Sequence, residues 1–290
     1  MLVAEGLQRL RLARRPGICA LMRAARLIDP YNPDADLHQA VTARTIGFRI
    51  APLLNAAGRM NDANKCVELL STTSFRVADA VARELVEANG KRQQCEREVL
   101  EEASVVAKEQ YEAGARAILL ANAAWHPGVL GIVASRLVER YNVPAIVTSV
   151  DDSGIAKGSV RGPDGIDMLE ALRSCRDLLE TYGGHRVAAG VAFKHEGYQE
   201  LRQRIDAHVR GQTRDGERPV RELTIDATIR LPNLQPSLLD ELQRLAPFGA
   251  GNPEPLFEAR GVTPIQARTV SGKSLRLRFR QGSELSLIHI

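Results

Sequence analysis

The sequence has few cysteines and aromatic residues, and it has no long apolar run. Its four cysteines lie far apart and none forms a Cys-x-x-Cys pair, which argues against a zinc ribbon or redox motif and fits a reducing compartment, the cytoplasm. No apolar run approaches the ~20 residues that cross a bilayer, which excludes an integral membrane protein. The arginine-rich opening contains no serine and is interrupted by Pro16-Gly17, so we expect no transit peptide.

The overall composition and net charge of the sequence are ordinary for a folded protein. The 290 residues carry 39 Lys+Arg against 35 Asp+Glu, a net charge of +4, with 44% hydrophobic and 26% charged residues. This composition excludes collagen, a disulfide mini-scaffold and a wholly disordered chain. At about 100–200 residues per domain, the length predicts two domains and part of a third.

The first third of the chain is expected to be mainly helical. Residues 1–30 predict one or two short helices, whereas residues 31–60 are rich in glycine and proline and predict loops. From Phe75 to Glu112, apolar or small residues recur at steps of three and four, the spacing of one helical stripe. The other faces of this long helix are charged, so we expect a connector that packs its stripe on two domains.

Residues 113–212 have the texture of an α/β domain. Buried strands are predicted at 117–121 and 144–150, with a helix at 131–140 between them, a βαβ unit that implies a parallel pair with a right-handed crossover. A helix at 167–180, a strand at 187–193 and a helix at 198–209 complete the domain.

The last part of the chain predicts a small β-barrel with one basic face. A polar stretch at 211–221 is typical of a linker, and the segment from Arg260 to Arg280 holds six basic residues and no acidic one. Arg276, Arg278 and Arg280 alternate with apolar residues, which places the arginines on one sheet face. Because residues 287–290 are still strand-like, we expect the barrel to be truncated. A solvated face is the alternative interpretation of the basic run.

Four short segments could carry chemistry, each with a plain structural alternative. Paired glycines let a backbone approach an anion, and Gly183-Gly184-His185 adds an imidazole; the alternative is a glycine turn with a surface histidine. The segment 157–162 offers the Ser159 hydroxyl and the Arg161 guanidinium to a phosphate, or it is a basic turn. Asn55 and Arg59 flank small residues, as in a binding loop or a packed turn. Residues 125–128, Trp-His-Pro-Gly, follow the first strand, where ligands bind in α/β folds, or form a hydrophobic lid.

Other patterns predict no site. Residues 267–274 satisfy a loose phosphate-loop pattern, but a basic alternating strand follows where a helix is required. We find no convincing set of Asp and His ligands for a metal, and no Ser-His-Asp or Cys-His arrangement.

Taken together and in this order, these motifs resemble the RecJ family of single-strand-specific 5′→3′ DNA exonucleases, within the DHH phosphoesterase superfamily, which act in DNA repair and recombination. The resemblance covers essentially the whole chain. Gly-Gly-His alone indicates only a DHHA1-type domain, whereas the joint pattern is much more specific. The stretches that carry it are GFRIAPLLNAAGRM (47–60), WHPGVLGIVASRLVERY (125–141), KGSVRG (157–162), YGGHRVAAG (182–190) and PFGAGNPEP (247–255).

The resemblance implies a layout of the end of a DHH domain at 1–50, a linker with the long connecting helix at 51–112, a DHHA1-type domain at 113–212 and a truncated OB-type domain at 213–290. It implies metal-dependent phosphodiester hydrolysis with Mn²⁺ or Mg²⁺, bound by an N-terminal domain whose Asp-His-His motif this sequence lacks, so we expect the fragment to be inactive alone. The implied partners are single-stranded DNA, single-strand binding protein and a helicase.

The resemblance also implies roles for individual residues. Ser159, Arg161 and His185 would contact the 5′ end or the scissile phosphate, and Gly183 and Gly184 would shape the pocket. The residues expected to contact nucleic acid elsewhere are Asn55, Arg59, Lys273, Arg276, Arg278 and Arg280. The sequence departs from the family pattern at Leu53, where the family usually has arginine, and at Gly162, where it often has serine. Two other functions stay open: a non-catalytic single-strand binding module, and a phosphodiesterase for short oligonucleotides.

Overall fold

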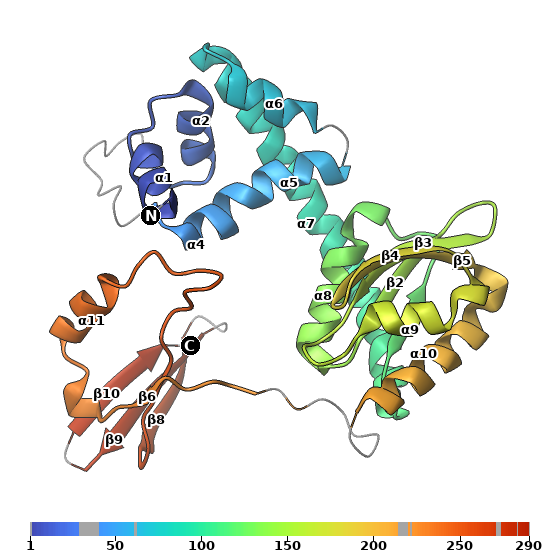
Figure 1. The fold of residues 1–290 in the computed structure, drawn as a ribbon. Coiled ribbons are helices and arrows are strands. Elements are labelled where there is room, and N and C mark those ends of the chain that lie inside the picture. Colours follow the sequence, from blue (N-terminus) through green and yellow to red (C-terminus); the bar gives the residue numbers. More distant parts are fainter. Residues whose placement is uncertain are drawn as a thin grey trace. The chain divides into compact units, whose positions relative to one another are not determined.

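The computed structural model describes residues 2–28, 41–60, 63–213, 220, 222–270, 274–282 and 284–289. They divide into two units, one formed by residues 1–14, 27–48 and 222–290 and the other by residues 15–26 and 49–221. Each unit has its own elements (Figure 1). None of the helices in the described ranges is long and apolar enough to cross a membrane.

The larger unit is organised around α7, a helix of 38 residues from Phe75 to Glu112 whose bounds agree with those expected from the sequence. The Ser74 hydroxyl caps it by accepting a hydrogen bond from the Val77 N–H, at 3.4 Å. Three shorter helices pack on its first half, namely α2 (Pro16–Ala24), α5 (Ala51–Met60) and α6 (Asn64–Ser71). In Figure 1 they gather around one half of α7, while α8 lies along the other half.

Helical structure replaces the loops that the sequence predicts within residues 43–60. α4 (Ala43–Thr45), a π-helix at Ile46–Ile50 and α5 follow one another without a break. The wide π turn ends two residues before Pro52, the second residue of α5, whose ring removes a backbone donor, so the proline is accommodated. Burial of Leu53 and of two alanines further along α5 then outweighs the glycine and proline signals.

The second half of this unit is a five-stranded sheet of order β1-β2-β3-β5-β4. β1 and β2 pair in parallel, as the βαβ interpretation requires, and the other pairs are antiparallel. Their bounds are Ile118–Ala121 for β1, Ala145–Val150 for β2, Ile155–Arg161 for β3, Leu179–His185 for β4 and Ala188–Lys194 for β5.

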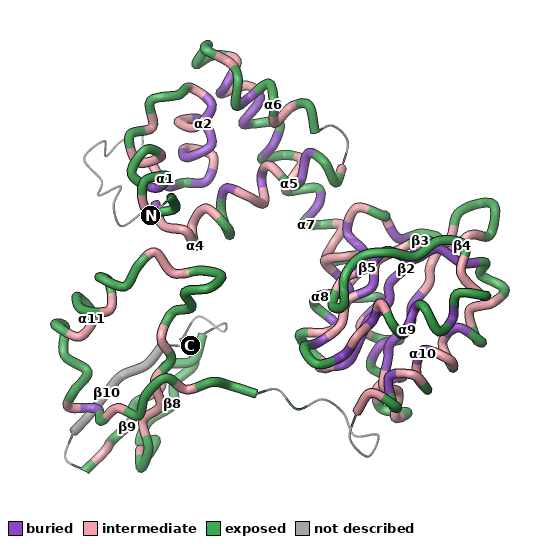
Figure 2. The backbone as a smooth tube through the Cα atoms, viewed as in Figure 1, coloured by how far each residue is buried: buried purple, intermediate pink, exposed green. Residues whose placement is uncertain are grey.

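Helices cover both faces of the sheet. α7 and α8 (Leu130–Tyr141), with a short 3₁₀ turn at Pro127–Val129, pack on the face that carries Ala145 and Val147. α9 (Met168–Ser174) and α10 (Tyr198–Gln212) pack on the face that carries Ile146 and Val160. β4 lies at an edge and is exposed from Glu180 onward (Figure 2).

Two predictions for this domain are wrong in detail. The helix expected at 167–180 ends at Ser174, and after a 3₁₀ turn at Arg176–Leu178 the chain enters β4. The segments around Ser159 and Gly183, interpreted as turns in their structural alternatives, are strands β3 and β4. Glycine is a poor strand former, which hid them. Gly158 is nonetheless required in β3, because an added Cβ would lie 2.0 Å from the Val147 carbonyl oxygen.

The smaller unit contains α1 (Leu2–Arg11) and a C-terminal β region. β8 (Thr263–Val270), β9 (Ser274–Gln281) and β10 (Glu284–His289) form an antiparallel sheet, and β6 (Ala227–Thr228) pairs with β7 (Phe257–Glu258). A short helix, α11 (Pro236–Gln243), also belongs to this unit. Strands β8 and β9 flank residues 271–273, so the loose phosphate-loop pattern has no helix after it.

Candidate nucleic-acid interface

The first part of the site is the end of β3, which carries Ser159 and Arg161 on one face of the sheet. Their partners on β2 are Val147 and Ala145, which belong to the core under α8. Cross-strand partners share a face, so Ser159 and Arg161 face α8. Gly131 confirms this placement, because a Cβ added there would lie 2.9 Å from Arg161 Nη2 and 3.1 Å from Ser159 Oγ.

Gly131 is the second residue of α8, so these side chains lie at the amino end of that helix. The N-cap residue is Val129, whose side chain forms no capping hydrogen bond. The N–H of Leu130, the first residue of α8, donates to the Pro127 carbonyl oxygen in the preceding 3₁₀ turn, but the amino end of the helix still carries partial positive charge. The positive end of α8, the Ser159 hydroxyl and the Arg161 guanidinium therefore form an arrangement that suits an anion.

Arg59, near the end of α5, adds a second guanidinium. Its Nη1 donates a hydrogen bond to the Gly128 carbonyl oxygen at 3.1 Å, in the turn just before α8. Burial lowers the pKa of the Arg161 guanidinium, and the positive charge of Arg59 lowers it further. In the described ranges neither arginine has a carboxylate partner. We call the group formed by Arg59, Ser159, Arg161 and the first turn of α8 the arginine pocket.

His185 lies at the end of β4 on the same face of the sheet as Arg161. The register runs from Arg161 to Ala188 on β5 and from Ala188 to His185 on β4. Two strand spacings separate the backbones, about 9.5 Å. His185 is exposed and no described residue hydrogen-bonds its side chain. The residue between Arg161 and His185 in this row is Ala188, whose small side chain projects little from that face of the sheet.

The two glycines before His185 have different roles. Gly183 shares a row with Gly190 and Ser159, and a Cβ added to it would meet open space. Gly184 has a φ of +143°, and a Cβ there would lie 2.5 Å from the Ala188 carbonyl oxygen. Gly184 is therefore needed for the hairpin itself, whereas Gly183 keeps the shared face open.

Asn55 and the two positions that depart from the family pattern are also placed. Asn55 is exposed and stands four residues before Arg59, on the same side of α5. Leu53 is buried, so it faces the core of the helical region. A Cβ added to Gly162 would lie 2.8 Å from Met168 Cγ, so this position packs against α9.

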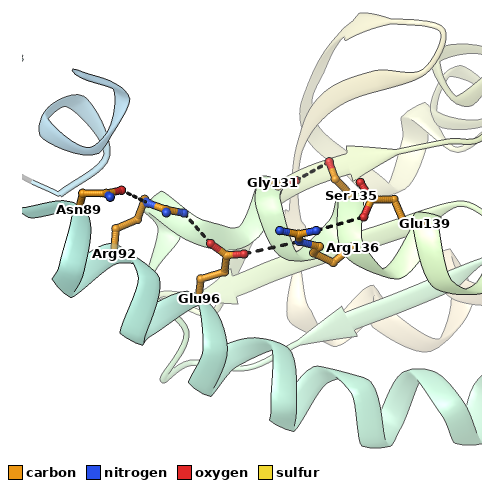
Figure 3. A network of polar contacts seen from close by, with 7 residues as sticks. All are labelled: Asn89, Arg92, Glu96, Gly131, Ser135, Arg136 and Glu139. Atoms are coloured by element: carbon orange, nitrogen blue, oxygen red, sulfur yellow. Dashed lines mark hydrogen bonds and ion pairs between the residues drawn. The ribbon is translucent and has the colours of Figure 1, made fainter. Parts of the chain in front are cut away.

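A network of polar contacts holds α8 against α7 (Figure 3). Glu96 on α7 bridges Arg92 on the same helix, at 2.5 Å, and Arg136 on α8, at 3.7 Å. The Arg92 and Glu96 side chains are only 11% and 13% exposed. Trp125 adds a second tie, because its Nε1 donates to Glu102 on α7 at 2.8 Å. These contacts fix the helix that forms one wall of the arginine pocket.

His126 does not reach the arginine pocket as a free side chain. Its Nδ1 accepts a hydrogen bond from the Gly128 N–H at 3.0 Å and so caps the turn before α8. Trp125 is buried in the core. The sequence argument did not identify Gly131, although a glycine in the first turn of a predicted amphipathic helix is a signal for close approach.

The basic strand of the smaller unit is β9. Arg276, Arg278 and Arg280 are exposed, whereas Leu277 and Phe279 between them are partly buried, as the alternation predicts. Arg268 on β8 pairs in register with Arg276. Arg260 is less available than the sequence suggested, because it forms an ion pair with Glu258 at 2.6 Å. Lys273 lies outside the described residues.

Metal ligands do not gather in the part of the chain that the structure describes. No group of three or more His, Cys, Asp and Glu side chains there could hold a metal ion. The described residues therefore do not fit a metal centre, and the site is one of guanidinium groups, a hydroxyl, an imidazole and backbone N–H groups.

Comparison with known proteins agrees with this geometry. Residues 114–211 match the model of the DHHA1 domain, and residues 225–289 match that of the RecJ OB domain. The chain is 36% identical over 257 residues to the single-stranded-DNA-specific exonuclease RecJ of Bacillus subtilis, covering 88% of this chain and 31% of that protein.

Solved structures give the same result. The crystal structure of RecJ from Thermus thermophilus in complex with Mg²⁺ is similar with a TM-score of 0.80 and 35% identity, covering 99% of this chain and 42% of that chain. Its complex with Mn²⁺ is similar with a TM-score of 0.81 and covers 40% of that chain. The chain therefore spans about a third to two-fifths of these relatives.

The larger unit thus contains a DHHA1 domain, which contributes Ser159, Arg161 and the start of α8 to the arginine pocket. The match of residues 225–289 to the RecJ OB domain narrows the class of protein further, because a DHHA1 domain alone would not distinguish the RecJ family. The chain belongs to the RecJ family.

Proposed function

We propose that this chain holds single-stranded DNA by its 5′ end for a 5′→3′ exonuclease of the RecJ type. The observation that carries the proposal is the arginine pocket, in which Arg59 and Arg161 lie close together without a carboxylate partner in the described ranges. A terminal phosphate carries up to two negative charges and three acceptor oxygens, which matches two guanidinium groups and a helix terminus.

Within this proposal, each residue has a physical task. Arg161 and the Ser159 hydroxyl donate hydrogen bonds to the phosphate, and the first turn of α8 adds backbone N–H groups. His185, one hairpin away on the same face, contacts the next phosphate along the strand, and Gly183 leaves room for the backbone. Asn55 and Arg59 border the path of the strand. Fixed donors of this kind also offset charge that develops on a reacting phosphate.

The exposed arginines of β9 would bind further phosphates without regard to sequence. In this proposal the end of a DHH domain comprises residues 1–50, and the linker with α7 comprises residues 51–112. The DHHA1 domain then comprises residues 113–212, and the OB domain residues 213–290. Single-strand binding protein and a helicase are the proposed protein partners.

The proposed cofactor is Mg²⁺ or Mn²⁺, because relatives are known in complex with both ions. The described residues do not fit such an ion, so we assign its ligands to an N-terminal domain of the DHH type.

The test is a comparison of two 5′ ends. Fluorescence anisotropy would measure the binding of one labelled oligonucleotide with a 5′-phosphate or a 5′-hydroxyl. We expect a preference of about 10- to 100-fold for the phosphate, from charge-assisted hydrogen bonds of about 1.5–3 kcal/mol. Arg161→Gln should abolish this preference. Arg173→Gln, a control at an exposed arginine on α9, should retain it. Equal affinity of the unmodified protein for both ends would overturn the proposal.

A further inference from the structure

A second polar cavity lies away from the arginine pocket, where the end of α7 meets β1 and α10. Its volume is about 370 Å³, and its walls include Gln110 and Ala113 from α7, Ala117 before β1, and Arg202, Asp206 and Arg210 from α10. α10 packs on the face of the sheet opposite to the one that carries Arg161. The two sites are therefore separate.

The wall formed by α10 is a single stripe of that helix. Arg202, Asp206 and Arg210 follow at steps of four residues, so they share one side of the helix. The buried residues Leu201, Ile205 and Val209 form another stripe, which packs in the core. The core stripe holds α10 in place, so the polar stripe faces the cavity from a fixed helix.

The acidic group of the cavity is already satisfied. Asp206 Oδ1 accepts hydrogen bonds from the backbone N–H groups of Arg116, at 2.5 Å, and Ala117, at 3.2 Å. Its Oδ2 accepts one from Arg210 Nε at 2.7 Å. Two backbone N–H groups and one guanidinium thus share this carboxylate, which leaves little of its charge for a second guanidinium.

Arg202 is the group left without a partner. Its Nε is buried and has no hydrogen-bond acceptor among the described residues. Two other polar side chains nearby on α10 are engaged, because the Tyr198 hydroxyl donates to the Leu119 carbonyl oxygen at 2.5 Å and Glu200 pairs with Arg204 at 3.6 Å. A buried N–H of a charged group without an acceptor is rare in folded proteins, because water is removed from the group and nothing replaces it.

We propose that this cavity binds a small molecule or ion through a terminal oxyanion, a phosphate or a carboxylate, held by Arg202. A guanidinium presents a planar fork of donors that matches such oxygens, and the fork here includes the Nε that lacks an acceptor. The volume suits a small ligand. The alanine methyl groups of the wall leave the space open beside the charge.

The test follows the Nε–H of Arg202 by ¹⁵N NMR while inorganic phosphate is added to the full chain. We expect a saturable shift of the Arg202 resonance, which persists in Arg161→Gln because the arginine pocket is separate. A parallel titration with acetate distinguishes the two kinds of oxyanion. A larger shift with phosphate assigns a phosphate group, and a larger shift with acetate assigns a carboxylate.

Binding is then measured by calorimetry on two variants and a control. Arg202→Lys keeps the charge but loses the fork, so we expect the dissociation constant of this site to rise about 10-fold or more. Arg202→Gln should remove the site, and Arg173→Gln should not change it. If neither anion shifts the Arg202 resonance, or if the Arg202→Gln variant binds the preferred anion with unchanged affinity and stoichiometry, the proposal is wrong.

Discussion

Arg161 and His185 lie in one transverse row of the central sheet, with Ala188 of β5 between them. The register brings an arginine and a histidine 24 positions apart in sequence onto the same face. Because the residue between them is small, that face is open toward a ligand lying across the strands. In the proposed function, this relationship lets the two residues contact the same strand of DNA.

Gly131→Ala should weaken recognition of a 5′-phosphate without unfolding the domain. The added Cβ would lie 2.9 Å from Arg161 Nη2, so the flexible guanidinium must move out of the arginine pocket. We expect the preference for 5′-phosphate over 5′-hydroxyl DNA, measured by anisotropy, to fall about 10-fold. Gly90→Ala is the matched control, since its Cβ meets open space in α7; it should leave the preference unchanged and stabilise the protein by up to about 1 kcal/mol.

Gly158→Ala should destabilise the protein strongly. Here the clash is with backbone, 2.0 Å from the Val147 carbonyl oxygen, and cannot be relieved by a side-chain rotation. We expect a loss of about 3 kcal/mol or more in the free energy of unfolding, measured by urea denaturation. Gly183→Ala, whose Cβ meets nothing, should change stability by less than about 0.5 kcal/mol. Similar stabilities for the two variants would contradict the close approach of β2 and β3 at Gly158.

Glu96→Gln should destabilise the contact between α7 and α8. The substitution leaves Arg92, 11% exposed, without its charged partner. We expect a loss of about 2–3 kcal/mol in thermal or urea denaturation, less than for a fully buried pair. Glu87→Gln, in an exposed pair with Lys91, should cost much less, because solvent screens that pair. An equal loss of stability in both variants would show that the Glu96 network stabilises the protein no more than an exposed ion pair does.

Removing single arginines from β9 should reduce the salt dependence of DNA binding. Each of Arg276→Gln, Arg278→Gln and Arg280→Gln should lower the slope of log K against log salt by about 0.7, the value for one phosphate contact with a single strand. His185→Ala would leave most affinity for a long oligonucleotide intact if the chain were only a binding module, and would reduce it if His185 contacts the strand as proposed. Binding that does not depend on salt would exclude both.

The hairpin between β2 and β3 should lose stability in acid. Hydrogen bonds from Ser153 and Lys157 hold the pKa of Asp151 well below its usual range. A carboxyl whose pKa is lower in the folded state stabilises that state above its unfolded pKa of about 3.9, and this contribution is lost as pH falls below that value. Urea denaturation between pH 6 and 2 should show a smaller acid-induced loss for Asp151→Asn than for the unmodified protein. An identical pH dependence would contradict the assignment.

The elements with a clear hydrophobic period were predictable from the sequence. The stripe from Phe75 to Glu112 predicted α7 to the residue, and the apolar runs predicted β1 and β2. β3 and β4 were not predictable, because Gly158 and Gly183 weaken the strand pattern and their pairing is decided by distant partners. α5 was missed because Pro52 and Gly58 suggested loops, whereas burial against α7 keeps the segment helical.

For the site, residue types were predictable but neighbours were not. Ser159, Arg161 and His185 stood out by chemistry and by resemblance. The proximity of Arg59 to Arg161 was not predictable, because it joins residues about a hundred positions apart and depends on the contact of α5 with the turn before α8. Gly131 and Arg202 were not identified as site residues from the sequence. Gly131 matters because a Cβ added there would lie within 3 Å of the Arg161 guanidinium, and Arg202 matters because its buried Nε has no hydrogen-bond acceptor among the described residues.

Among the residues that the structure describes, neither Arg59 nor Arg161 has an acidic partner, and this has a practical consequence for binding assays. A site with two positive groups takes its counterion from the buffer, so sulfate, phosphate or citrate should compete with a 5′-phosphate for the arginine pocket. Affinities measured in chloride and in phosphate buffers should therefore differ even at the same ionic strength, and the difference should vanish when the arginine on β3 is replaced.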